Sequence, residues 1–80
     1  MKVKVLFPHG EEEITEVIGL TRDGDTSVAI RFAFNSYSTF EYDELESMYY
    51  WCNGAWKEIL LDRPPIEIHE ELCRLYVRAR

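Results

Sequence analysis

Residues 40–56, which read FEYDELESMYYWCNGAW, contain the side chains best suited to a chemical role. Four carboxylates and six aromatic rings fall within this stretch. Carboxylates attract cationic groups, and Tyr and Trp supply much of the binding energy at protein interfaces. The stretch therefore predicts an acidic, aromatic binding surface, whose expected contact residues are Glu41, Asp43, Glu44, Glu46, Tyr50 and Trp51.

A second acidic block consists of Glu11, Glu12 and Glu13. Runs of like charge usually form solvated loops or the ends of strands, and less often they contribute to the footprint of a partner. We assign these three carboxylates to the same candidate partner-binding surface.

The histidines and cysteines do not form a recognisable catalytic or metal-binding motif. His69 and Cys73 are four residues apart and could share a metal ion with His9 and Cys52. However, zinc sites of this kind usually carry paired short spacings such as C-x2-C, which the sequence lacks. The same residues could supply a nucleophile and a base, but an 80-residue chain leaves little room for a deep pocket. We therefore expect no catalytic residue, no metal and no cofactor, and the protein is predicted not to be an enzyme.

The position of the acidic and aromatic side chains depends on the structure of residues 43–53. A helix is favoured, because Asp43 can cap its N-terminus with Glu46 at the third helical position. Asn53-Gly54 supplies the left-handed residue that commonly ends a helix. The apolar stripe of this helix would consist of Leu45, Met48, Tyr49 and Cys52.

The alternative for the same residues is a β-hairpin with Asn53-Gly54 as the two central residues of a type I′ turn. Trp51 would then lie opposite Trp56, and Cys52 opposite Ala55. In either structure some rings leave the core and lie beside carboxylates. The competing interpretation is that this element is enclosed on two sides, so that its rings are buried.

The rest of the chain predicts an antiparallel sheet followed by one clear helix. Apolar residues alternate along several segments, as is typical of strands, and Asp23-Gly24-Asp25 indicates a hairpin turn between two of them. The predicted strands are residues 2–7, 14–22 with a bulge at Gly19, 26–34, 37–42 and, at the edge of the sheet, 55–61.

The predicted helix runs from Ile66 to Arg80. Pro65 suits its first turn, and its acidic residues come first and its arginines last, which complements the helix dipole. The fold class is therefore predicted to be α+β: one domain of 80 residues with an antiparallel sheet of four to five strands and one or two helices packed on one face.

Charge is distributed unevenly along the chain. The formal net charge is −6, and residues 5–71 hold all 15 acidic residues but only four basic ones. Such a field repels phosphates and attracts cations, so we expect no direct binding to nucleic acid. No apolar run approaches the ~20 residues of a membrane helix, so no membrane partner is expected. The two cysteines are predicted to be free thiols in a reducing, cytoplasmic compartment.

The leading hypothesis is a small, non-enzymatic inhibitor that occludes a basic, nucleic-acid-handling surface of a larger protein. Its carboxylates would occupy phosphate positions and so mimic nucleic acid, while its rings would supply desolvated contacts. In size, charge and ring content the chain resembles phage-encoded inhibitors of bacterial defence, such as anti-CRISPR proteins, and the immunity proteins of nuclease toxins. The alternative is a structural module or small subunit that buries its aromatic rings in a homodimer.

Overall fold

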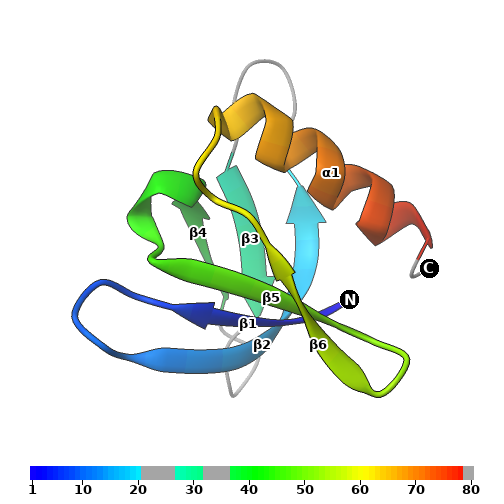
Figure 1. The fold of residues 1–80 in the computed structure, drawn as a ribbon, viewed down its shortest axis with the longest axis horizontal. Coiled ribbons are helices and arrows are strands. Elements are labelled where there is room, and N and C mark those ends of the chain that lie inside the picture. Colours follow the sequence, from blue (N-terminus) through cyan, green and yellow to red (C-terminus); the bar gives the residue numbers. More distant parts are fainter. Residues whose placement is uncertain (21–26, 32–36, 79–80) are drawn as a thin grey trace.

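The computed structural model describes residues 1–20, 27–31 and 37–78. Within these residues the chain forms six β-strands, one 3-10 turn and one α-helix, which Figure 1 shows in chain order. The elements are β1 (Lys2–Leu6), β2 (Glu12–Leu20), β3 (Ser27–Arg31), β4 (Tyr37–Glu41), the 3-10 turn η2 (Tyr42–Glu44), β5 (Ser47–Cys52), β6 (Ala55–Ile59) and α1 (Pro65–Arg78).

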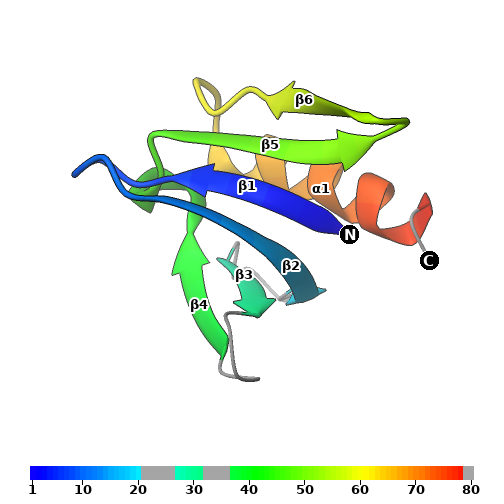
Figure 2. The same ribbon diagram turned by 90° about the horizontal axis from the view of Figure 1, so that it is seen from below.

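The six strands form one antiparallel sheet in the order β4-β3-β2-β1-β5-β6, and α1 lies against one of its faces (Figure 1 and Figure 2). We call this side the helix-covered face and the other side the open face. The arrangement confirms the predicted α+β class. The sheet has one strand more than expected, because both arms of the segment around Asn53-Gly54 are strands.

Residues 47–59 form a hairpin, and the helix predicted over residues 43–53 is wrong. Asn53 and Gly54 have φ angles of 51° and 80°, the two left-handed positions that a type I′ turn requires. Trp51 lies opposite Trp56, with ring centroids 5.1 Å apart in an edge-to-face arrangement. The aromatic run before the turn is typical of strands, and pairing with both β1 and β6 outweighs the local helix signals.

The other predicted elements agree with the structure where it describes them. β4 matches the strand predicted at residues 37–42, and β6 is an edge strand, as predicted for residues 55–61. α1 begins one residue before the predicted start and extends to Arg78. Residues 21–26, which contain the predicted Asp23-Gly24-Asp25 turn, lie outside the described residues, and so do residues 79–80. The same holds for residues 32–36, which include the last part of the strand predicted at 26–34.

The bulge predicted at Gly19 is confirmed by a shift in the β2–β3 register between Val17 and Gly19. A bulge bends a strand and increases its twist. β2 therefore runs beside β1 over its first half and beside β3 over its second half, and β3 and β4 turn away from the direction of β5 and β6 (Figure 2).

The hydrophobic core lies between α1 and the helix-covered face. Ile68 and Leu72, four residues apart on α1, are at most 2% exposed. Full burial of each such side chain contributes about 1.5 to 3 kcal/mol to folding. Among the residues whose side chains the structure describes, the other buried apolar ones are Val3, Val5, Val17, Tyr42, Leu45, Met48 and Ile59.

Candidate protein-binding surface

Strand β1 brings the two acidic blocks together at one end of the sheet. Leu6, the last residue of β1, lies between Glu12 of β2 and Ser47 of β5. The backbone N–H of Glu46 donates to the carbonyl oxygen of Leu6 at 2.8 Å. The β1–β2 turn and η2 therefore lie at the same end of the sheet (Figure 1 and Figure 2). We call this region the acidic end and define it by Glu11, Glu12, Glu13, Glu41, Asp43, Glu44 and Glu46.

The 3-10 turn holds the second acidic block in place. The backbone N–H of Glu41 donates to Oε2 of Glu44 at 3.0 Å, an interaction typical of a helix N-terminus. The predicted cap instead used Asp43 and Glu46, whose side chains are exposed and make no side-chain hydrogen bond among the described residues. These two carboxylates are therefore available for a partner without disturbing the turn.

The negative charge of the acidic end is only weakly neutralised. The carboxylate of Glu11 lies 2.9 Å from Nε2 of His9, and none of the other six carboxylates has an ion-pair partner within the part of the chain that the structure describes. Six of the seven side chains are exposed. Glu13 is half-buried, because it lies opposite Val5 on the helix-covered face. Unpaired carboxylates gathered at one end of a sheet favour a cationic partner.

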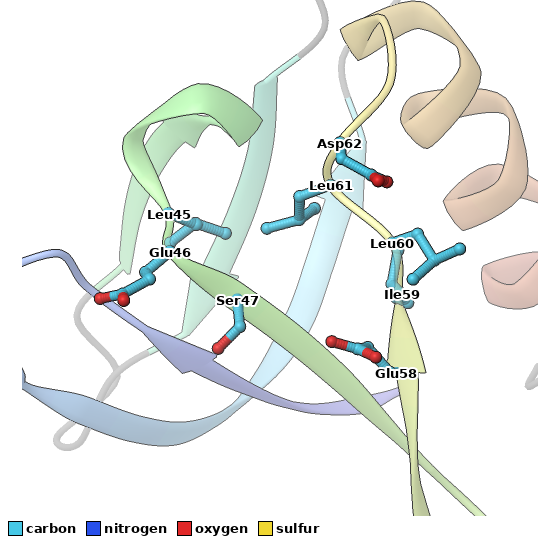
Figure 3. A pocket seen from close by; sticks show the side chains of 8 residues that line it. All are labelled: Leu45, Glu46, Ser47, Glu58, Ile59, Leu60, Leu61 and Asp62. Atoms are coloured by element: carbon cyan, nitrogen blue, oxygen red, sulfur yellow. The ribbon is translucent and has the colours of Figure 1, made fainter.

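A hollow of about 390 Å³ lies beside the acidic end. The carboxylates that line it extend the negative surface of the acidic end toward β6. It lies where β5 and β6 stop pairing, beyond the Met48–Ile59 pair. Leu45 and Leu61 point toward one another across it, and the carboxylate of Glu58 points toward Ser47 (Figure 3). The hollow thus combines an apolar lining with carboxylates, which are those of Glu46, Glu58 and Asp62.

The structure separates the two aromatic residues that the sequence assigned to the surface. Tyr50 and Trp51 are neighbours on β5, so their side chains lie on opposite faces of the sheet. Tyr50 is half-buried against the core, whereas Trp51 is 45% exposed on the open face. Both lie toward the end of β5 that is farther from Ser47 and the acidic end.

Two lysines of β1 lie over aromatic rings of the open face. The sequence did not predict these contacts. Nζ of Lys4 is 4.9 Å from the ring centroid of Tyr49 and 5.1 Å from that of Trp56. Nζ of Lys2 is 5.9 Å from the ring of Trp51. These distances fit cation–π contacts. The described ring contacts of Trp51 are with Lys2 and Trp56, and Tyr49 on the same face lies opposite Glu58.

His69 lies in the core, where the Tyr42 hydroxyl is 2.7 Å from its Nδ1. Burial raises the pKa of Tyr42 well above its ordinary value, and Cys73 adds to this shift. The four residues weighed as metal ligands do not converge, since His9 lies in the β1–β2 turn and Cys52 at the far end of β5. The described residues contain no cluster of three or more His, Cys, Asp or Glu side chains that could hold a metal ion. Both cysteines are free thiols.

The fold and the acidic end define a small α+β domain with one strongly negative end. No family model matches the chain, and no curated protein or solved structure matches it either. The one described helix is too short and too polar to span a membrane.

Proposed function

We propose that this domain is a non-enzymatic binding protein that docks its acidic end on a basic, nucleic-acid-handling surface of a larger protein and so occludes it. One observation carries the proposal. The hydrogen bond from Glu46 to Leu6, together with the Leu6–Glu12 pairing, gathers two acidic blocks that are distant in sequence into one weakly neutralised surface. A surface of this charge speeds the encounter with a cationic partner and rejects anionic ones.

The binding mechanism would be competition for phosphate positions. Exposed carboxylates on a rigid sheet end can pair with arginines and lysines that otherwise bind a nucleic-acid backbone. The Leu60 side chain, 56% exposed beside these carboxylates, could add an apolar contact. Trp51 lies on the open face, toward the end of β5 that is farther from the acidic end. It would therefore contact only a partner that also covers the open face.

The test reverses charge at Asp43 and Glu46, which are exposed and stand outside the Glu41–Glu44 hydrogen bond. The wild type and the Asp43→Lys/Glu46→Lys variant are used as bait in a lysate of the source cells, and captured proteins are quantified by mass spectrometry. A Glu16→Lys/Glu70→Lys variant is the matched control, because both residues are exposed and lie outside the acidic end.

We expect the wild type and the control to capture a basic protein that the Asp43→Lys/Glu46→Lys variant loses. We also expect wild-type protein to displace nucleic acid from the captured partner. Equal capture by all three baits would contradict docking through the acidic end, and capture without displacement would contradict occlusion.

The open face favours a second candidate function, a structural module that forms a homodimer. Ile14 and Trp51 are 57% and 45% exposed on this face, where apolar surface is expected to find a partner. Sedimentation equilibrium distinguishes the two functions. A dimer in which iodide does not quench Trp51 would support the module, and a monomer with an accessible Trp51 would exclude it.

A further inference from the structure

A second hollow, also of about 390 Å³, lies toward the opposite end of β5 from the acidic end. Its walls come from the residue before β1, from the β5–β6 hairpin and from the last turns of α1. The N-terminus, the tip of this hairpin and the end of α1 lie on the same side of the molecule (Figure 1). Its volume lies at the small end of the ~300–1,000 Å³ typical of ligand pockets.

The apolar part of the lining continues the hydrophobic core toward the last turns of α1. Met48 and Ile59 form a buried pair in the β5–β6 ladder, and Tyr50 with Lys57 is the next pair on the same face. Tyr50 and Leu75 pack partly against the core and also line the hollow. A ligand here would therefore extend the hydrophobic core with its own apolar part.

The charge at the hollow is opposite in sign to that of the whole protein. Lys57 and Arg78 line it, and none of the described lining residues is acidic, in a chain with 15 acidic and nine basic residues. Neither cation has a carboxylate within ion-pair distance in the described part of the chain. Two uncompensated cations beside an apolar lining complement a ligand with an anionic head and an apolar body.

We propose that this hollow binds a small amphipathic anion, an aliphatic carboxylate. The hydrocarbon part lies against Tyr50 and Leu75, and the carboxylate pairs with Lys57 and Arg78. The site is independent of the proposed docking surface, because it uses no residue of the acidic end.

The two free cysteines provide an internal comparison for the test. Cys52 lines the hollow, whereas Cys73 lines a different surface depression with Arg74, Val77 and Arg78. Arg78 borders both, so Lys57 is the cation that belongs to the hollow alone. Octanoate, below its micellar concentration, is titrated into the protein, and the alkylation rate of each cysteine by iodoacetamide is followed by mass spectrometry. We expect saturable, several-fold slower alkylation of Cys52 and an unchanged rate at Cys73. Uncharged 1-octanol should protect Cys52 much less at the same concentration.

Variants that each remove one positive charge then test whether the cations of the hollow, and not cations elsewhere on the protein, bind the carboxylate. Lys57→Gln and Arg78→Gln are each expected to raise the octanoate concentration needed for half-protection of Cys52 about tenfold. Arg74→Gln, an exposed position on the same helix, should leave it unchanged. Equal protection by octanol, equal protection of both cysteines, absence of protection, or equal effects of the three variants would each overturn the proposal.

Discussion

The hydroxyl of Tyr42 and Nδ1 of His69 lie 2.7 Å apart inside the core, and this hydrogen bond joins the 3-10 turn of the acidic end to α1. The two rings also meet edge to face, with centroids 5.7 Å apart. Because the turn carries Asp43 and Glu44 on its outer side, this buried contact helps to fix the geometry of the proposed docking surface.

Removing the Tyr42 hydroxyl tests the energetic value of this link. Tyr42→Phe keeps the ring but deletes the hydroxyl that is hydrogen-bonded to His69, and we expect it to lower the free energy of unfolding by about 1 to 2 kcal/mol. Urea denaturation measures the change. Tyr49→Phe is the control, since Tyr49 is only half-buried and its ring lies on the open face beside Lys4. An equal loss of unfolding free energy in both variants would show that the Tyr42–His69 hydrogen bond contributes no more to stability than the hydroxyl of Tyr49 does.

The raised pKa of Tyr42 predicts a loss of stability at alkaline pH. Burial disfavours the phenolate, so the pKa in the folded state lies above the ordinary value of about 10 that applies in the unfolded state. The unfolded state therefore releases this proton first. The contribution of Tyr42 to stability is complete below pH ~10 and falls as the pH rises above it.

The measurement is the free energy of unfolding of the wild type and Tyr42→Phe from pH 7 to above pH 11. Other groups affect both proteins alike, so we expect the wild-type curve to fall more steeply above pH ~10. Parallel curves over the whole range would disprove a specific role for Tyr42.

The lysine contacts on the open face predict an effect of Lys4 on the tryptophan environment. Lys4→Gln removes the cation near the rings of Tyr49 and Trp56, and we expect a loss of about 0.5 to 1 kcal/mol and a changed emission spectrum. Arg74→Gln removes an exposed cation of α1 and should leave the emission nearly unchanged. Identical spectra for wild type and Lys4→Gln would argue against the contact.

The type I′ turn predicts that alanine substitutions at two glycines have very different effects on stability. Gly54 has a φ angle of 80°, so Gly54→Ala should cost about 1 to 2 kcal/mol and weaken the near-ultraviolet circular dichroism of the Trp51–Trp56 pair. Gly19→Ala is the control, because a Cβ atom there meets no atom within 4 Å and its φ angle is not positive. Its stability should stay the same or rise slightly. Equal costs at both positions would contradict the turn assignment.

The sequence predicted the strands and the last helix well because their signals are local. Each of these signals depends only on residues that are adjacent in the sequence. Examples are the alternation in residues 2–7, the bulge residue Gly19 and Pro65 at the start of α1. Asn53-Gly54 is compatible with both a helix end and a hairpin turn. The choice between them depends on β1, which pairs with β5 in a register that runs from Leu6–Ser47 to Val3–Tyr50, 41 to 47 positions apart in the chain.

The candidate surface was predictable in its residues but not in its arrangement. The two acidic blocks are visible as runs, yet their meeting depends on the contact of Glu46 with Leu6, 40 residues earlier in the chain. The same long-range pairing places Lys4 beside Tyr49 and Lys2 beside Trp51. Local patterns cannot report such contacts, because nothing near Lys4 in the sequence indicates which strand will lie beside it.

The central position of β1 also has a consequence for biosynthesis. β1 and β2 are translated well before β5, so one side of β1 has no hydrogen-bonding partner until the ribosome has passed Cys52. Pairings between segments far apart in the chain form slowly, and an open strand edge can recruit other chains. Nascent chains and fragments that stop before Ser47 are therefore the forms of this protein most prone to aggregate.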